Sequence, residues 1–208
     1  MGQILKTERL ILRDLRPDDI DDFFEYAKNP NVNSELSGWK PHFTNKEKAM
    51  EFLKSYAESN DTWAIALRDS GKVIGHLKIY PDENRGQFSE RNSAKLITYA
   101  LSEDCWYKGY MTEAVKQAVK YAFDETGIEL LTAFHVPYNI RSKRVIEKCG
   151  FQYETTIEQG FKNYDGQVYD SVIYSIMKSD YCTTMKENEN LRNGKNNELP
   201  PNEEGFVR

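Results

Sequence analysis

The chain has 208 residues, a length sufficient for one domain with a sizeable core, and its net charge is −5. The acidic balance argues against a nucleic-acid surface, which needs basic clusters to displace counterions, and it is compatible with a cationic substrate. No apolar run approaches the roughly 20 residues of a membrane helix, no signal segment is visible, and the cysteines (Cys105, Cys149, Cys182) fit neither a metal site nor a disulfide framework. We therefore expect a cytoplasmic protein with no metal, no nucleic-acid partner and no membrane partner.

The first half of the chain predicts strands and helices in turn. A strand is expected at 4–13, followed by a helix that Pro17 opens, because proline and acidic residues favour a first helical turn. A second helix is expected at 45–58. Alternating apolar residues then predict strands at 63–67 and 73–79, joined by a tight turn containing Gly71. Residues 82–93 are polar and are expected to form a loop.

The second half predicts a strand at 96–101 and a long amphipathic helix, followed by a strand at 130–136, a helix after Asn139, and a hairpin of 151–160 and 168–177. The apolar residues of the long helix recur at spacings of three and four: Met111, Ala114, Val115, Ala118, Val119, Ala122 and Phe123. Strands that alternate with helices in the middle, between antiparallel flanks, predict an α/β (α+β) fold. Its sheet is mixed and mostly antiparallel, with helices on both faces.

The last part of the chain has a different composition. Residues 183–208 are rich in Asn and Glu and contain few large apolar side chains. Such a segment buries too little surface to offset its ordering entropy. We expect one domain at 1–182 and an appendage at 183–208 that is either mobile or packed on a neighbour.

The most informative segment is 106–114, with the sequence WYKGYMTEA. It lies between a predicted strand and the long helix, so its loop directs several unpaired backbone N–H groups at one point. The positive end of the helix dipole lies there too, and such a place binds phosphate. In the alternative interpretation, Gly109 only permits a tight turn, and Glu113 suits the dipole without any ligand. The segment is neither a P-loop nor a dinucleotide fingerprint, because it has a single glycine.

A second segment, residues 139–151 (NIRSKRVIEKCGF), follows the predicted strand at 130–136. Together the two segments resemble the GNAT superfamily of acetyl-CoA-dependent N-acetyltransferases. They are most similar to the branch that acetylates the N-termini of ribosomal proteins. Residues 7–13 (TERLILR) and 38–42 (GWKPH) look like that branch too. The resemblance covers roughly 7–178.

The resemblance implies a fold whose central parallel strands splay apart to admit acetyl-CoA as co-substrate. It implies direct transfer to an amine, without an acyl-enzyme. The free strand edge from Tyr99 to Leu101 would pair with the pantetheine amides, and Asn139 would hydrogen-bond the pantetheine arm or cap its helix. The residues whose backbone would hold the pyrophosphate are Lys108, Gly109, Tyr110, Met111 and Thr112.

The chain departs from the general superfamily at its catalytic positions. Many members carry a tyrosine seven residues after the asparagine as the acid for the leaving thiolate, and this chain has Ile146 there. The ribosomal branch implies a serine three residues after the asparagine, which is Ser142, although a serine in a first helical turn also caps or faces solvent. Trp106 and Met111 replace the Gln/Arg and the Gly/Ala of the broad loop motif.

No general base is predicted. The glutamate of the branch falls by counting on Phe161, and an acid common on the fourth strand falls near Leu96. Glu158 and Asp170 are nearby carboxylates that fit a hairpin surface equally well. At pH 7 an α-amine is about 14% neutral, a cost of about 1 kcal/mol, whereas a lysine-like amine is about 0.04% neutral, a cost of about 4.6 kcal/mol. A site without a strong base therefore favours an α-amine.

The function that we predict is acetyl transfer from acetyl-CoA to a primary amine, either a protein N-terminal α-amine or a small amine. Trp39 and Phe43 would line the acceptor pocket, or pack in the core. The oligomeric state is expected to be monomer or homodimer. Alternatives are a catalytically weak CoA-binding module with a regulatory or interaction role, and an unrelated nucleotide-binding domain. Cys149 is predicted to belong to the core, because a helix C-terminus disfavours a thiolate.

Overall fold

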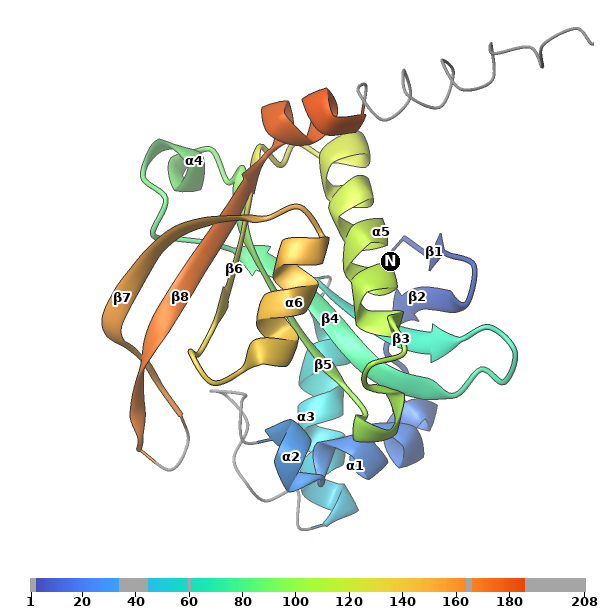
Figure 1. Cartoon of the computed structure of the whole chain (residues 1–208). Helices are drawn as coiled ribbons and strands as arrows, with labels where there is room; N and C mark the ends of the chain where they lie inside the picture. The colour runs from blue at the N-terminus through green and yellow to red at the C-terminus, as the bar shows by residue number, and fades with distance from the viewer. Residues whose placement is uncertain (1–2, 34–44, 60, 164–165, 186–208) are drawn as a thin grey trace, which may run out of the picture.

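One open sheet runs through the molecule and is covered by helices (Figure 1). The computed structural model describes residues 3–33, 45–59, 61–163 and 166–185. The strands are β1 (Leu5–Lys6), β2 (Leu10–Asp14), β3 (Thr62–Leu67), β4 (Val73–Pro81), β5 (Ala94–Leu101), β6 (Leu130–His135), β7 (Gln152–Lys162) and β8 (Val168–Met177). Their order in the eight-stranded sheet is β1-β2-β3-β4-β5-β6-β8-β7, and only β5 and β6 are parallel neighbours. The predicted mixed, mostly antiparallel sheet is confirmed.

Helices cover both faces of this sheet, as predicted. They are α1 (Ile20–Ala27), α2 (Pro30–Asn33), α3 (Lys46–Glu58), α4 (Gln87–Glu90), α5 (Tyr110–Glu125) and α6 (Ile140–Lys148), with 3-10 helices η1 (Pro17–Asp19) and η2 (Glu103–Cys105). Alternating side chains of β3 divide the core: Ile65 packs on the face of α5 and α6, whereas Ala64 and Ala66 pack on the face of α1 and α3. The period of two in a strand therefore produces two hydrophobic clusters, one on each face.

Local signals in the sequence set several of these boundaries. Asn45 caps α3 by accepting a hydrogen bond from the backbone N–H of Lys48 at 3.0 Å. Asn139 caps α6 in the same way. Gly71 takes a positive φ of 76° in the turn between β3 and β4, where a side chain would be strained. The predicted boundaries at these three places are confirmed.

Two predicted elements differ from the structure. The strand expected at 4–13 is broken into β1 and β2, because Thr7 forms a turn in which its hydroxyl accepts from the backbone N–H of Leu10 at 2.9 Å. The turn brings β1 back onto β2 as an antiparallel pair. The loop expected at 82–93 contains the short helix α4. The turn that joins the two strands of the predicted hairpin, 151–160 and 168–177, lies partly outside the described residues.

Strands β4 and β5 approach each other closely at Gly75, which pairs with Leu101. A Cβ atom at Gly75 would lie 2.3 Å from the carbonyl oxygen of Ala100, which is shorter than any van der Waals contact. Only glycine therefore permits β4 to hold the C-terminal half of β5 in place. That half of β5 borders the candidate site described below.

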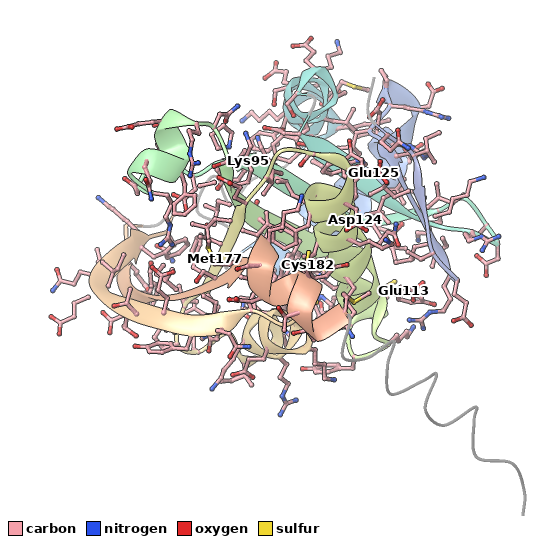
Figure 2. The ribbon with its side chains drawn as sticks, turned by 90° about the horizontal axis from the view of Figure 1, so that it is seen from above. Lys95, Glu113, Asp124, Glu125, Met177 and Cys182 are labelled. Carbon is pink, nitrogen blue, oxygen red and sulfur yellow. The ribbon has the colours of Figure 1, made fainter. Side chains whose placement is uncertain are left out.

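Residues 178–185 continue from β8 as a helix that lies over the C-terminal end of α5 (Figure 2). The ring of Tyr181 is 5.2 Å from that of Phe123 on α5, centroid to centroid. The described helix crosses the predicted boundary between 182 and 183, and most of the predicted tail lies outside the described residues. Within the described part of the chain, no helix is long and apolar enough to cross a membrane.

Candidate active site

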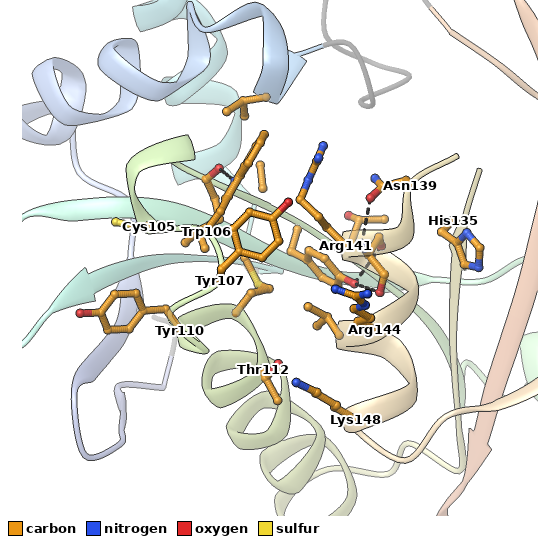
Figure 3. A pocket seen from close by; sticks show the side chains of 18 of the residues that line it. Cys105, Trp106, Tyr107, Tyr110, Thr112, His135, Asn139, Arg141, Arg144 and Lys148 are labelled. Carbon is orange, nitrogen blue, oxygen red and sulfur yellow. Dashed lines mark hydrogen bonds between the residues drawn. The ribbon is translucent and has the colours of Figure 1, made fainter. Parts of the chain in front are cut away.

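The candidate site is a cavity that opens where β5 and β6 part. The two parallel strands pair only from Ala94 opposite Leu130 to Leu96 opposite Thr132. Beyond these residues β5 continues to pair with β4, and β6 continues to pair with β8. Each strand follows its antiparallel partner, so a gap with a volume of about 320 Å³ opens between them and is bordered by α5 and α6 (Figure 3).

This cavity brings together most of the residues that the sequence predicts for the cofactor. Its lining includes Tyr99, Leu101, Gly109, Tyr110, Met111, Thr112, Asn139 and Ser142. Lys108 is absent from the lining, and its carbonyl accepts a hydrogen bond from Arg9 on the other side of the loop. Trp39 and Phe43 lie outside the described residues. The role of each residue toward a ligand stays a prediction.

The loop before α5 has the backbone shape of an anion site. Gly109 is the N-cap of α5 with a φ of 81°, and no side chain caps the helix. Tyr107 also has a positive φ, of 61°, although it is not a glycine and its side chain is exposed. Such a conformation costs about 1–3 kcal/mol at a non-glycine residue and collects at functional sites. Positive φ values within a turn aim successive N–H groups at one concavity, which suits phosphate.

Trp106 anchors this loop to the end of β5. Its indole N–H donates to the carbonyl of Leu101 at 2.9 Å. The guanidinium of Arg141 lies over the indole ring, 4.1 Å from the ring centroid. The tryptophan that replaces the Gln/Arg of the broad motif therefore places an arginine from α6 beside the loop. Sequence reasoning missed this cation, because it lies in another element.

Helix α6 contributes further positive charge to the same cavity. Arg141, Arg144 and Lys148 all belong to the lining and lie at spacings of three and four, so they share one face of the helix. Figure 3 shows Lys148 extending toward Thr112 on α5. The spacing of these basic residues was a signal available in the sequence. The cavity mouth therefore combines three cations with a helix N-terminus, an arrangement that attracts anions.

Ser142 is fixed by two partners from different elements. The side-chain oxygen of Asn139 accepts from the backbone N–H of Ser142 at 2.9 Å, which confirms the capping role of Asn139. The Ser142 hydroxyl oxygen lies 3.0 Å from the hydroxyl oxygen of Tyr99, which also donates to the Ser142 carbonyl at 3.3 Å. Burial raises the pKa of Tyr99 above its usual value. Tyr99 therefore stays protonated at neutral pH and holds Ser142 from across the cavity.

Carboxylates do not belong to the described lining of the cavity. Phe161, where counting placed the base, is buried and lies 5.8 Å from the ring of Phe134. Glu158 is exposed on β7, and Asp170 accepts from the backbone N–H of Gln159 at 2.9 Å. These contacts place both acids in the hairpin, and neither is a candidate base in this structure.

Two other titratable side chains lie nearby. His135 lines the cavity; its Nδ1 is 2.8 Å from the Val136 carbonyl, and its Nε2 has no hydrogen-bond partner among the described residues. Cys149 is buried, and burial raises the pKa of its thiol to about 12, as expected for a core residue rather than a nucleophile. Within the described part of the chain, no three His, Cys, Asp or Glu residues gather as metal ligands would.

Comparison with known proteins identifies the family. The acetyltransferase (GNAT) domain model matches residues 9–152, well over half of the chain. "Uncharacterized N-acetyltransferase YoaA" of Bacillus subtilis (strain 168) is 26% identical over 183 residues, 86% of this chain and 98% of the relative. "[Ribosomal protein uS5]-alanine N-acetyltransferase" of Escherichia coli (strain K12) is 23% identical over 189 residues, 85% of this chain and 92% of the relative.

Solved structures share the fold. The microcin C7 self immunity acetyltransferase MccE, in complex with acetyl-CoA and AMP, aligns with a TM-score of 0.70 at 19% identity. The alignment covers 82% of this chain and 93% of that one. The chain therefore belongs to the GNAT family of acetyltransferases. It is an acetyl-CoA-dependent N-acetyltransferase, and the cavity between β5 and β6 is its candidate active site.

Proposed function

We propose that this enzyme acetylates a primary amine by direct attack on the thioester, and that the acceptor is a protein N-terminal α-amine or a small amine. The observation that carries the proposal is the cavity itself. It joins the helix N-terminus at Gly109, the free edge of β5 and the Ser142 hydroxyl, and its described lining contains no carboxylate. Such a site positions its reactants and supplies dipoles rather than a strong base.

The cofactor arrangement follows from these elements. The backbone N–H groups of Gly109, Tyr110 and Met111 would hold the pyrophosphate, assisted by the cations of α6. The edge of β5 from Tyr99 to Leu101 would pair with the pantetheine amides as an added strand. The acetyl group would then lie deeper in the gap, toward Ser142. The MccE complex, which contains acetyl-CoA on a similar fold, supports acetyl-CoA as the co-substrate.

The reaction forms one bond, breaks another and moves two protons. The neutral amine forms a C–N bond to the acetyl carbon, and the C–S bond then breaks. The departing thiolate takes a proton from the Ser142 hydroxyl, and the proton lost by the nitrogen returns through solvent to keep the balance. Tyr99 lies within hydrogen-bond distance of the Ser142 oxygen, and by donating its own hydrogen there it would leave the serine hydrogen free to point toward the sulfur. Each such proton transfer is worth about 10²–10⁴ in rate.

The absence of a carboxylate from the described lining favours an amine that is already partly neutral. An α-amine with a pKa near 7.8 meets this requirement at pH 7, whereas a lysine side chain costs about 3.6 kcal/mol more to deprotonate. The Escherichia coli relative is named for an alanine of ribosomal protein uS5, which is compatible with an α-amine acceptor. A small amine of similar basicity fits equally well.

An acceptor panel tests the proposal. Free-thiol release from acetyl-CoA is measured with peptides that carry a free N-terminus, with N-terminally blocked peptides that contain one lysine, and with small amines of graded pKa. We expect the free α-amines to react fastest at pH 7, and the advantage to shrink as pH rises toward 10. Equal rates at pH 7 for α-amines and lysine side chains would contradict the proposed acceptor class. Acetyl-CoA binding without thiol release from any amine would favour the binding-module alternative.

A further inference from the structure

The turn between β1 and β2 makes a long-range contact with the first turn of α5. Glu113 Oε1 accepts from the Thr7 hydroxyl at 2.6 Å and from the backbone N–H of Arg9 at 2.9 Å. Glu113 Oε2 lies 2.7 Å from Arg9 Nε and 2.6 Å from Arg9 Nη2. These contacts join residues more than 100 positions apart in the chain and satisfy both carboxylate oxygens.

The same guanidinium also contacts the loop. Arg9 Nη1 donates to the carbonyl of Lys108 at 3.0 Å, and Arg9 Cζ lies 4.4 Å from the centroid of the Tyr110 ring. Arg9 Nη2 is 3.5 Å from the position that a Cβ atom on Gly109 would occupy. Arg9 therefore contacts Lys108 and Tyr110 and lies beside Gly109 between them. Arg9 is not part of the cavity lining, so it contacts the loop outside the cavity.

Charge makes this contact important for an anionic ligand. The N-terminus of a helix carries about +0.5 charge, and the carboxylate of Glu113 in the first turn opposes it with a full negative charge. Partial burial tends to raise the pKa of Glu113, but the hydrogen bonds from Thr7 and Arg9 outweigh it and hold that pKa below its usual value. Glu113 is therefore ionised at neutral pH. Without a cation at hand, Glu113 would repel phosphate groups from the N–H groups of its own helix.

We propose that Arg9 is a positioning residue for the phosphates of acetyl-CoA: it neutralises Glu113 and fixes the Lys108-Gly109-Tyr110 loop so that the N–H groups face the cavity. The inference rests on the proposed binding of acetyl-CoA at the Gly109 loop. Thr7 and Arg9 act through that loop and contact no reacting atom. The prediction specific to this role is that substitution of Arg9 weakens the binding only of ligands that carry the pyrophosphate.

The test compares acetyl-CoA with S-acetylpantetheine, which has the same thioester and amides but lacks the nucleotide and pyrophosphate. We expect Arg9→Ala to weaken acetyl-CoA affinity by about tenfold, the size of one charge-assisted contact at a helix N-terminus. The kcat/KM for S-acetylpantetheine should change less than twofold. Arg9→Lys keeps the charge but loses the forked geometry, so we expect about a threefold loss for acetyl-CoA alone.

Two further variants separate the explanations. Arg91→Ala breaks a largely exposed ion pair with Glu129, neither residue of which lines the cavity, and is the matched control, with no expected change for either ligand. Arg9→Ala with Glu113→Gln removes both charges, and acetyl-CoA affinity should recover toward the wild-type value. If Arg9→Ala fails to fold, Arg9→Lys and its selectivity between the two ligands decide the outcome.

The inference is overturned if Arg9→Ala leaves acetyl-CoA affinity within twofold, or if it lowers the kcat/KM for both ligands equally. It is also overturned if the Glu113→Gln change restores nothing in the Arg9→Ala background. Failure of the underlying site looks different: Gly109→Glu would then bind acetyl-CoA as tightly as the wild type does, whatever the Arg9 variants show. Affinities are measured by titration calorimetry, with thermal unfolding as the check on folding.

Discussion

Replacement of Tyr99 by Phe tests how Ser142 is held for catalysis. The change removes one hydroxyl, which lies 3.0 Å from the Ser142 oxygen, and leaves the ring that packs against the core. Loss of one hydrogen bond is worth about 1 kcal/mol, and a released serine hydroxyl spreads over about three staggered rotamers, a further factor of about three. Together these effects predict that kcat falls about 10- to 20-fold.

The measurement is steady-state thiol release at saturating amine, with acetyl-CoA affinity determined separately. We expect Tyr99→Phe to leave that affinity within twofold, because the hydroxyl acts on Ser142 and not on the cofactor phosphates. Ser142→Ala should lower kcat by about 10- to 1,000-fold, somewhat less than a full general-acid contribution, because solvent water can protonate the thiolate in part. Because burial raises the pKa of Tyr99, the wild-type pH profile should show no inflection from this phenol below pH 10.

The double variant decides the mechanism. If Tyr99 acts only through Ser142, Tyr99→Phe should have no further effect in the Ser142→Ala background. Effects that multiply would refute the reasoning, because they would mean that Tyr99 contributes independently of Ser142. If Ser142→Ala lowers affinity but not kcat, Ser142 is a capping or binding residue only. Tyr121→Phe, which alters a ring packed on Trp63 outside the cavity, is the control.

Four further predictions concern the frame of the site. Gly109→Glu should abolish acetyl-CoA binding in a folded protein, measured by calorimetry, because a side chain strains a backbone with φ of 81° and a second carboxylate would add negative charge beside the phosphate site. Unchanged affinity would reject the cofactor assignment. Gly75→Ala should lower the free energy of unfolding, measured by urea denaturation, by about 1–3 kcal/mol, because the added Cβ would lie 2.3 Å from a carbonyl oxygen of β5. A variant as stable as the wild type would show that the two strands can move apart without penalty. Burial lowers the pKa of His76 to about 3, so the unfolded chain binds the proton first as pH falls below 6.5. The free energy of unfolding should therefore drop by about 2 kcal/mol more between pH 7 and 5 than it does in His76→Gln, and parallel curves for the two proteins would contradict this. Truncation after Cys182 should preserve both the fold and acetyl transfer, because residues 183–208 carry few large apolar side chains. If the truncated protein unfolds, or if light scattering shows a changed oligomeric state, the tail has a structural role.

Features with a local cause could be predicted from the sequence. Asn45 and Asn139 cap helices by bonds to residues three positions on, and the apolar period of α5 matches the face that it buries. The turn at Thr7 was missed although its cause is also local, because a threonine hydroxyl that bonds its own turn leaves the alternation of apolar residues intact. Short-range hydrogen bonds of this kind compete with a strand without changing its pattern.

Features of the site that join distant segments could not be predicted. The bond between Tyr99 and Ser142 and the contacts of Arg9 with Glu113 depend on how the sheet places β1, β5 and the helices. The family resemblance placed a base by counting at Phe161, but β7 and β8 shift register between Ile157 and Phe161, so counting along the hairpin is unreliable there. Because Trp39 and Phe43 lie outside the described residues, their place in the acceptor pocket stays a prediction.

The short pairing of β5 with β6 also has a mechanical consequence. The sheet consists of a five-stranded half, β1 to β5, and a three-stranded half, β6 to β8, which share a ladder of only three residue pairs. Helices α5 and α6 pack on the sheet in one hydrophobic cluster that includes residues of both halves. A pantetheine arm laid along the seam would act as a strut, because it adds amide bonds where the ladder ends. Binding of acetyl-CoA would then stiffen the two halves against each other, and dissociation of CoA after transfer would loosen them.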